Sequence, residues 1–293
     1  MNNLEFNYHK PGTFEEVFEI LNNSDNPSLI AGGTDVLVEI RKGLRQTSDV
    51  VSLKNLKELK IIEQKDNQIV IGAAATHNEV KNSPLVKEKI FAVSEAASRI
   101  GTEQVRNTAT IGGNLCTGAS CCDMAPVLIS YNARLEILTS KGKRTILLKD
   151  FFSDHKKTSL NKGEILAKII VPIPDNQTGI SFIKFGLRDA ASISVASVSV
   201  MVKYTDGLCT DSKIVIGAVA PTPIVCKKAG ELLLNFSSED INDEIKLLKI
   251  GKDAAEDALP IDDIRGSADY RRKLLKVLTM RAIKTAFYRA KHI

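Results

Sequence analysis

The sequence predicts an α+β protein whose helices and strands are arranged differently in three successive stretches. In the first 56 residues, helix and strand patterns alternate. From there to about residue 177, a run of short helices stands between strands. The last third is typical of antiparallel strands followed by helices. We therefore expect an N-terminal domain of residues 1–177, with sub-lobes 1–56 and 57–177, and a C-terminal domain of residues 178–293.

The first stretch carries the signals of a small βαβ unit. A helix is expected directly after Thr13, which can cap it, because Glu16 completes a capping box. The apolar run 28–31 predicts a strand that ends at a glycine pair. A helical pattern over 36–40 and a second strand over 50–53 complete the unit.

The middle stretch mixes helices with strands. Residues 78–100 are expected to form helices broken at Ser83-Pro84, and a further helix is expected over 126–130. Strands are expected over 69–72, 134–138, 144–148 and 164–174, and the second and third of these form a hairpin that turns at Lys141-Gly142.

The last stretch predicts a three-stranded antiparallel sheet followed by a helical bundle. Small or polar residues alternate with apolar ones, and Asp206-Gly207 is a strong turn signal. The second helix has a plausible cap at Ser267. The strands are expected over 181–185, 192–204 and 212–220, and the helices over 239–257 and 267–291.

Composition narrows the class of protein. The chain has 293 residues, of which 43% are hydrophobic, so it can bury a full core. Its longest apolar stretches, such as 193–202, fall short of the roughly 20 residues of a membrane span. The net charge of +5 is modest, and the sequence contains no basic patch interleaved with aromatics, so nucleic-acid binding is not expected. The N-terminal stretch MNNLEFNYHK lacks a secretion signal and the five cysteines lack framework spacing, so a cytoplasmic location is expected.

Two glycine loops share one pattern: an apolar lead-in, paired glycines and a short polar side chain. They are Ala31-Gly-Gly-Thr-Asp35 and Thr110-Ile-Gly-Gly-Asn114. Glycine lets the backbone approach a ligand and expose successive amides to phosphate oxygens. Neither loop matches the dinucleotide or P-loop fingerprint. Each could be a tight turn alone, whereas the two together could grip one pyrophosphate.

Three cysteines follow the second loop and raise the alternative of a metal or cluster site. Cys116 and Cys121 have the first spacing of a plant-type iron-sulfur motif, but Cys122 is adjacent where that motif needs a cysteine three residues on. We therefore expect no metal here. Cys121 or Cys122 could instead be open to oxidation.

Ordered motifs along nearly the whole chain resemble the FAD-binding medium subunit of molybdenum hydroxylases, the family of xanthine and carbon monoxide dehydrogenases. The motifs are AGGTDVL from Ala31, IGAAATH from Ile71, QVRNTATIGGN from Gln104, DMAP from Asp123, DFFS from Asp150, KTSL from Lys157, EIL from Glu164, FIK from Phe182 with Arg188, and SADYR from Ser267. The resemblance implies the two-lobed FAD-binding fold of the vanillyl-alcohol oxidase (PCMH) type, followed by a C-terminal sheet and helical bundle.

The resemblance also implies which residues bind FAD. The pyrophosphate would lie against both glycine loops, with Thr117 as a further hydroxyl donor and Asp123 in the family's acidic position. Ile165 and Leu166 would lie by the adenine, Lys184 by the polar edge of the flavin, and Ile100 and Ile193 beside its ring. The loop residues are Leu29, Ile30, Ala31, Gly32, Gly33, Thr34, Asp35 and Val36, then Thr110, Ile111, Gly112, Gly113 and Asn114.

No catalytic residue is expected on this chain, because a flavin supplies the redox chemistry and the protein positions and tunes it. A cation such as Lys184 near the ring would stabilise the reduced form. His77 could approach the same region, but a loop histidine with satisfied ring nitrogens is expected.

The family's division of labour implies partners. A large molybdopterin subunit and a small subunit with [2Fe-2S] clusters would pass electrons to FAD here and on to NAD+, as a dimer of heterotrimers of the xanthine or purine dehydrogenase type. A subunit of another aromatic or carbon monoxide-type dehydrogenase is the alternative. A self-contained flavin oxidase and a flavin-free scaffold remain two further alternatives.

Overall fold

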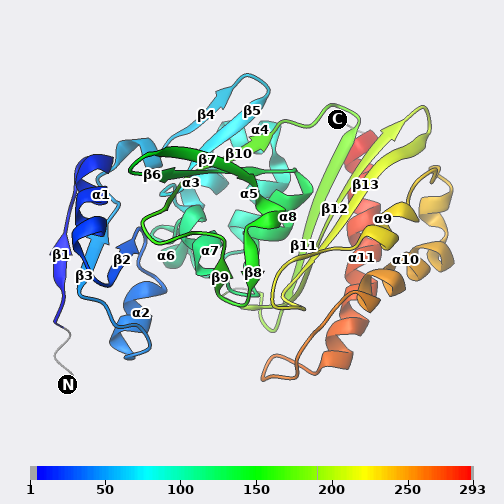
Figure 1. Ribbon diagram of the computed structural model, residues 1–293. Coiled ribbons are helices and arrows are strands. Elements are labelled where there is room, and N and C mark those ends of the chain that lie inside the picture. The colour runs from blue at the N-terminus through cyan, green and yellow to red at the C-terminus, as the bar shows by residue number, and fades with distance from the viewer. Residues whose placement is uncertain (1–4, 190, 292–293) are drawn as a thin grey trace.

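A computed structural model describes residues 5–189 and 191–291 of the chain (Figure 1), so the first four residues of the N-terminal stretch lie outside it. The chain begins with a three-stranded parallel sheet in the order β1-β3-β2. β1 (Asn7–His9) and β2 (Pro27–Ile30) both pair with β3 (Asp49–Ser52), and helices α1 (Phe14–Asn23) and α2 (Val36–Arg41) connect the strands. The predicted βαβ unit is confirmed, and β1 extends it.

The start of α1 follows the predicted cap with one difference. Thr13 Oγ1 accepts a hydrogen bond from Glu16 N at 3.3 Å, as expected for a capping residue. The Glu16 carboxylate, however, accepts from Gly12 N at 2.6 Å. The carboxylate of the predicted capping box therefore reaches one residue further back along the chain.

A five-stranded antiparallel sheet forms the middle of the molecule, in the order β4-β5-β10-β6-β7. The predicted hairpin turns at 140–141, because Gly142 already pairs with Thr139. A two-stranded ribbon stands beside this sheet. The strands are β4 (Ile62–Lys65), β5 (Gln68–Gly72), β6 (Arg134–Thr139), β7 (Gly142–Leu147) and β10 (Ile165–Pro172), and the ribbon is β8 (Phe152–Asp154) with β9 (Lys157–Thr158).

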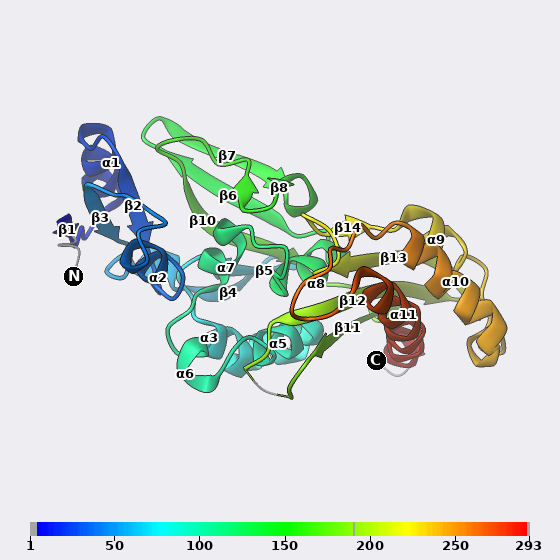
Figure 2. The same cartoon turned by 90° about the horizontal axis from the view of Figure 1, so that it is seen from below.

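Short helices cover one face of this sheet (Figure 2). Ser83 ends one helix and caps the next, which confirms the break predicted at Ser83-Pro84. The main core joins β5 and β10 to α5 and α8 through side chains such as Ile71, Ile169, Val93 and Leu128. The helices are α3 (His77–Asn82), α4 (Pro84–Lys89), α5 (Phe91–Ser98), α6 (Glu103–Arg106), α7 (Ile111–Thr117) and α8 (Met124–Ser130), with 3-10 turns η1 (Lys57–Leu59) and η2 (Leu148–Asp150).

The last part of the chain is an antiparallel sheet with helices on one face. The predicted three strands are β11 (Thr178–Gly186), β12 (Ser194–Thr205) and β13 (Leu208–Gly217), and the two-residue β14 (Ile224–Val225) adds a fourth. Alternate residues of β11 face opposite ways: Phe182 packs into the main core and Ile183 against the C-terminal helices. The sheet therefore joins the two cores.

The C-terminal helices are α9 (Lys227–Glu231), α10 (Glu244–Glu256) and α11 (Ala268–Lys291). The single helix predicted over 239–257 is instead a 3-10 turn, η3 (Asp240–Asn242), followed by α10, because Asp243 Oδ1 accepts from the amides of Ile245 and Lys246 and starts a new helix. Ser267 caps α11 as expected, with its hydroxyl accepting from Tyr270 N at 3.2 Å. Within the described residues, no helix is long and apolar enough to cross a bilayer.

Candidate cofactor site

A cavity of about 730 Å³ lies between the N-terminal sheet and the helices of the middle part. Residues of α2, β2 and α7 line it, and Figure 2 shows α2 and β2 to one side of α7. Both predicted glycine loops line it, although residues 36–109 separate them in the sequence. Its volume falls in the range of natural small-molecule sites, about 300–1,000 Å³.

The first glycine loop contacts the residues that flank the second loop on either side. Thr117 Oγ1 lies 3.2 Å from Asp35 Oδ2, which joins the end of α7 to the end of the first loop. A Cβ atom at Gly32 would lie 2.2 Å from the Thr108 carbonyl oxygen, so only glycine permits this contact. Gly33 has a left-handed φ of 78°. Two glycines of the first loop are therefore required by its geometry.

The two loops differ in how their amides are used. The amides of residues 32–35 donate no hydrogen bond to any described residue. In the second loop, by contrast, the amides of Ile111 and Gly112 donate to Ala75 and Ala73 at 3.0 and 2.9 Å. Gly113 N donates to Thr110 Oγ1 at 3.0 Å. The first loop therefore offers free donors for an anion, whereas the second is fixed against the sheet.

Twelve of the residues expected to bind the cofactor line the cavity. They come from β2, both glycine loops, α7 and the segment after α5. They are Leu29, Ala31, Gly32, Gly33, Thr34, Asp35, Val36, Ile100, Thr110, Gly113, Asn114 and Thr117.

Eight of the expected residues lie outside the lining. Ile30 packs with Ile40 and Val50, and Gly112 presses on Ala73. Ile111 and Leu166 belong to the main core, and Ile165 to the core around α1. Ile193 is 59% exposed in the loop before β12. The remaining two are Asp123 and Lys184.

Asp123 and Lys184 form a buried ion pair beside the cavity. Lys184 Nζ lies 2.7 Å from Asp123 Oδ2 and also donates to the Arg99 carbonyl at 3.0 Å. Ser194 Oγ donates to the other carboxylate oxygen. Burial raises the pKa of the Asp123 carboxyl, and the Lys184 ammonium opposes that shift. Lys184 therefore meets the cavity indirectly, through the segment that carries Ile100.

Charged side chains also line the cavity. Lys162 lines it and donates to the Asp25 carbonyl at 3.3 Å. Glu164 also lines it, but Arg144 holds both of its carboxylate oxygens at 2.7 and 2.6 Å and lowers the pKa of Glu164 to about 2. Lys162 therefore adds an ammonium group to a lining that also contains Asp25 and Asp35. No local pattern in the sequence marks Lys162 as a site residue.

His77 differs from its expectation. It is the first residue of α3, it is fully buried and it lines the cavity. Neither of its ring nitrogens has a hydrogen-bond partner among the described residues. Burial and then the charge of Arg106 lower the pKa of His77 to about 4, so the ring is neutral. The prediction of a loop histidine with satisfied nitrogens is therefore wrong.

The three neighbouring cysteines differ in their exposure and in their contacts. Cys116 is exposed on the cavity wall. Cys122 is buried and its thiol donates to Asn114 Oδ1 at 3.1 Å. Burial raises the pKa of both Cys121 and Cys122, which disfavours the reactive thiolate. Among residues 5–189 and 191–291, no three metal-ligating side chains form a group.

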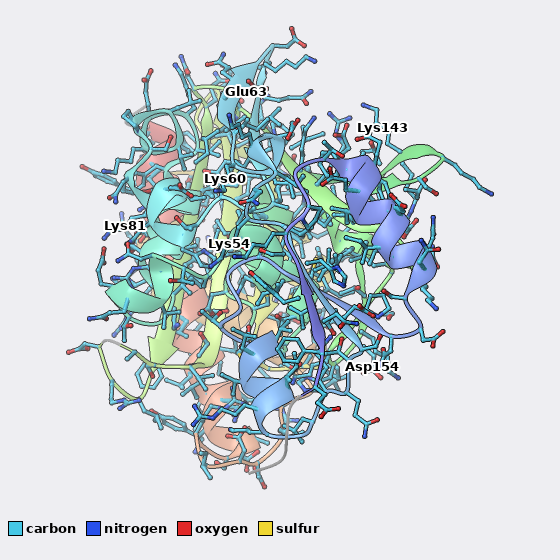
Figure 3. The ribbon with its side chains drawn as sticks, turned by 90° about the vertical axis from the view of Figure 1, so that its left-hand side faces the viewer. Lys54, Lys60, Glu63, Lys81, Lys143 and Asp154 are labelled. Carbon is cyan, nitrogen blue, oxygen red and sulfur yellow. The ribbon has the colours of Figure 1, made fainter. Side chains whose placement is uncertain are left out.

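A second, smaller cavity of about 170 Å³ lies behind the two glycine loops. It shares Ala31 and Thr110 with the first and is also lined by Lys54 and Lys60. Both lysines are near the middle of the face seen in Figure 3. Glu79 lines the same small cavity. The glycine loops thus separate the main cavity from a smaller one that is lined by charged side chains of both signs.

The main cavity suits FAD on its own features. The free amides of residues 32–35 can bind a pyrophosphate, and Lys162 adds a cation. Ile100 and Val105 offer apolar surface for a ring. Comparison with known families agrees: residues 4–174 match the FAD binding domain in molybdopterin dehydrogenase. The chain belongs to this family of FAD-binding dehydrogenase subunits.

The rest of the chain and its relatives agree with the family assignment. Residues 181–286 match the CO dehydrogenase flavoprotein C-terminal domain. The chain is 31% identical over 281 residues to the xanthine dehydrogenase FAD-binding subunit of Escherichia coli O157:H7, covering 95% of both chains. It is 33% identical over 236 residues to the nicotinate dehydrogenase FAD-subunit of Eubacterium barkeri, covering 78% of this chain and 80% of that one.

Solved structures show the same fold. A chain of quinoline 2-oxidoreductase from Pseudomonas putida 86 superposes with a TM-score of 0.92 at 28% identity, covering 98% of both chains. A chain of carbon monoxide dehydrogenase from Hydrogenophaga pseudoflava gives 0.91 at 27% identity, covering 97% of this chain and 98% of that one. The two-lobed FAD-binding fold with its C-terminal sheet and helices is therefore confirmed. As a member of this family, the chain is a flavoprotein subunit of an oxidoreductase.

Proposed function

We propose that this chain is the FAD-carrying electron-transfer subunit of a heteromeric molybdenum hydroxylase of the xanthine or purine dehydrogenase type. In that assembly FAD would supply the redox chemistry between the [2Fe-2S] clusters of a small subunit and NAD+. The observation that carries the proposal is the 31% identity to a xanthine dehydrogenase subunit along 95% of both chains. Substrate oxidation belongs to a large molybdopterin subunit, in a dimer of heterotrimers located in the cytoplasm.

We assign FAD binding by this chain to the residues that line the main cavity. The amides of residues 32–35 and the ammonium of Lys162 bind the pyrophosphate and its charge. Thr117 and Asn114 add polar contacts from α7, and Ile100 packs against the flavin ring. The segment 1–177, with sub-lobes 1–56 and 57–177, is the FAD-binding domain, and 178–293 is the C-terminal domain.

In this proposal, most of the eight expected residues outside the lining support the residues that line the cavity. Gly112 and Ile111 fix the second loop against Ala73 and the core, and Asp123 and Lys184 support the Ile100 segment. Ile30, Ile165 and Leu166 pack the walls from behind. Ile193, which is exposed, is available to a partner subunit.

A second candidate is an FAD subunit of another aromatic or carbon monoxide-type molybdenum dehydrogenase. It is favoured by the 33% identity to a nicotinate dehydrogenase subunit and by the TM-score of 0.92 to a quinoline oxidoreductase chain. The two candidates differ in the substrate of the large subunit and in the electron acceptor.

Purification of the native complex tests both candidates. We expect a tagged chain to bring down one larger and one smaller subunit, with FAD, molybdenum and iron. Flavin bleaching by xanthine or hypoxanthine, reversed by NAD+, supports the first candidate. Bleaching by nicotinate, another N-heterocycle or carbon monoxide instead supports the second. Flavin reduction by substrate in the chain alone would indicate a self-contained oxidase, and a colourless chain would indicate a flavin-free scaffold.

A further inference from the structure

The segment between α5 and α6 forms one wall of the main cavity. Ile100 is 9% exposed and lines the cavity directly after α5 ends at Ser98. Gly101 follows in a left-handed conformation, with a φ of 43°, and lets the chain turn into α6. The carbonyls of residues 99–101 thus receive no helical or strand hydrogen bond from the described residues.

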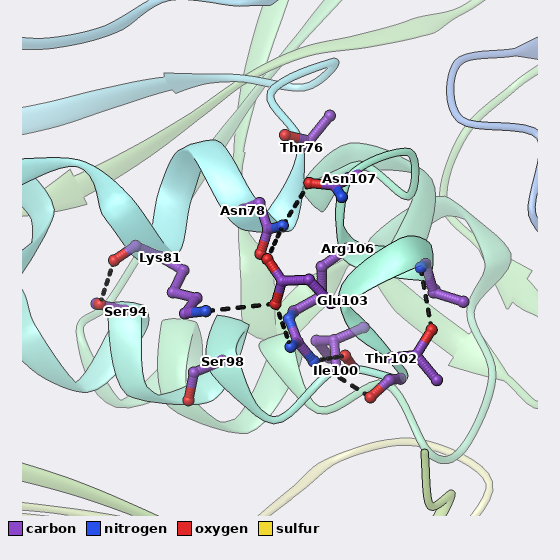
Figure 4. Close-up of polar contacts among 12 residues, drawn as sticks. Thr76, Asn78, Lys81, Ser94, Ser98, Ile100, Thr102, Glu103, Arg106 and Asn107 are labelled. Carbon is purple, nitrogen blue, oxygen red and sulfur yellow. Dashed lines mark hydrogen bonds and ion pairs between the residues drawn. The ribbon is translucent and has the colours of Figure 1, made fainter. Parts of the chain in front are cut away.

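Two cationic side chains hold these three consecutive carbonyls. Arg106 Nη1 donates to the Ile100 carbonyl at 2.7 Å and to the Gly101 carbonyl at 3.2 Å (Figure 4). From the other side, Lys184 Nζ donates to the Arg99 carbonyl at 3.0 Å. Among the described residues, no other group donates a hydrogen bond to these three carbonyl oxygens. The position of Ile100 therefore depends on Arg106 and Lys184.

Arg106 is itself fixed by a polar network. Its Nη2 lies 2.7 Å from Glu103 Oε2, and its side chain is 13% exposed. Asn78 Nδ2 donates to the other Glu103 oxygen at 2.6 Å and to Asn107 Oδ1 at 2.5 Å, as Figure 4 shows. Lys81 approaches the same carboxylate at 3.5 Å. A planar guanidinium can serve a carboxylate and two carbonyls at once, which a lysine cannot do with the same geometry.

We propose that Arg106 is a positioning residue for the cofactor: it holds the Ile100–Gly101 carbonyls and so keeps the Ile100 side chain against the bound flavin. The inference rests on the proposed function, in which Ile100 contacts FAD. Arg106 acts through the wall and does not touch the cofactor. Without it, the Ile100 and Gly101 carbonyls turn toward water and the wall loses its fixed shape.

Arg289 provides a matched control, because it makes the same kinds of contact with residues that do not line the cavity. Its Nη1 donates to the Ile180 carbonyl at 2.7 Å and its guanidinium pairs with Glu95, while its side chain is 20% exposed. Arg106→Met and Arg289→Met each remove an arginine that joins a carboxylate to a backbone carbonyl. A purely structural role predicts the same behaviour of the two variants.

The test compares FAD binding by the full chain after its flavin is removed. We expect both variants to lower the melting temperature, and only Arg106→Met to raise the Kd for FAD, by about tenfold, the value of one charge-assisted hydrogen bond. The absorption band of the bound flavin should also shift in Arg106→Met and not in Arg289→Met. In an Ile100→Ala background, Arg106→Met should add little further loss, because the residue acts through Ile100.

Several results would overturn the inference. The first is an FAD Kd and a flavin spectrum of Arg106→Met that equal those of the wild type. The second is an equal loss of FAD affinity in both arginine variants. The third is that the losses of FAD affinity in Arg106→Met and Ile100→Ala add fully in the double variant. If Arg106→Met does not fold, Arg106→Lys carries the same test with a smaller expected loss. A wild-type chain that binds no FAD would instead refute the proposed function together with this inference.

Discussion

Lys184 Nζ lies 2.7 Å from Asp123 Oδ2 where both side chains are more than nine-tenths buried. The pair joins β11 of the C-terminal sheet to the residue just before α8. Two charges removed from water are tolerated only when paired and hydrogen-bonded, and here Ser194 and the Arg99 carbonyl complete the set. This pair therefore links the C-terminal sheet to the cofactor wall.

Removing the lysine of this pair should destabilise the protein strongly. Lys184→Met leaves Asp123 buried without its counter-ion, which typically costs about 3–5 kcal/mol. Urea unfolding measures the loss. Because burial raises the pKa of Asp123, the carboxyl can escape the penalty by protonation, so the loss should be larger at pH 8 than at pH 5. Adding Asp123→Asn to Lys184→Met should recover part of the stability. A Lys184→Met variant as stable as the wild type would contradict the role of the pair.

Gly113→Ala should weaken FAD binding without unfolding the chain. Gly113 is exposed on the cavity wall, and a Cβ atom there would lie 2.9 Å from Thr110 Oγ1, so the hydroxyl that caps α7 must shift slightly. The methyl group would otherwise project into the cavity, while alanine favours the helix by about 1 kcal/mol. We expect at least a tenfold rise in the Kd for FAD, roughly 1.4 kcal/mol of binding free energy, measured by fluorescence titration.

Gly230→Ala is the control for this substitution. Gly230 also lies in a short helix, but its Cβ atom would have ordinary contacts, 3.6 Å from Ser212, and Gly230 does not line the main cavity. Its FAD affinity should equal that of the wild type. Equal affinity in Gly113→Ala as well would show that the cofactor does not approach the second glycine loop.

His77→Leu should stabilise the flavin-free chain. The substitution replaces two buried nitrogens that have no partners among the described residues by an apolar side chain of similar size, which should gain about 1–3 kcal/mol in unfolding free energy. Calorimetry of the flavin-free protein at pH 7.5 measures this gain. A destabilised variant would mean that the ring nitrogens have partners in solution, such as ordered water.

The same histidine predicts a pH dependence. Its pKa is about 4 in the fold, against the ordinary value of 6.5 for a free histidine side chain, so at pH values between these two the unfolded chain binds the extra proton. The stabilising contribution is complete above pH 6.5 and is lost as the pH falls toward 4, by at most about 3 kcal/mol. The wild type should therefore lose more stability than His77→Leu between pH 7.5 and pH 4.5. Parallel curves would contradict the lowered pKa.

The purified chain, separated from partner subunits, should contain no stoichiometric iron. Cys122 is buried and bonded to Asn114, Cys116 faces the cavity, and their surroundings hold no third ligand in the described part of the chain. Metal analysis beside flavin quantitation gives the ratio. One or more iron atoms per FAD, lost on changing Cys116 and Cys121 to serine, would establish a cluster that the structure does not suggest.

Local patterns predicted most elements of this fold, and they failed for some of the short strands. The long strands β11, β12 and β13 and the hairpin of β6 and β7 alternate apolar and polar residues over enough positions to be recognised. β2 and β3 are only four residues long, but their apolar runs predicted them. β1 and β4 contain few apolar residues and β14 has only two positions, so no local pattern shows these strands. They form because a neighbouring strand offers free backbone groups, which is a property of the fold as a whole.

The sequence predicted which two loops line the cavity, but it did not predict that their backbone amides differ in hydrogen bonding. Both glycine loops were recognised, but the free amides of the first and the occupied amides of the second depend on contacts with Ala73 and Ala75, which no local pattern encodes. His77 could have been placed better. Thr76 and Glu79 form a capping box in the structure, and their spacing in the sequence already marks His77 as the first residue of a helix.

Every residue that lines the cavity lies between Leu21 and Glu164. During synthesis, the whole surface that meets the cofactor thus leaves the ribosome before the C-terminal sheet, and the Lys184 contact to the Arg99 carbonyl arrives later. A nascent chain therefore contains every lining residue before its last strands are made. The wall around Ile100 and the core behind it are completed only later, by C-terminal residues such as Phe182 and Lys184.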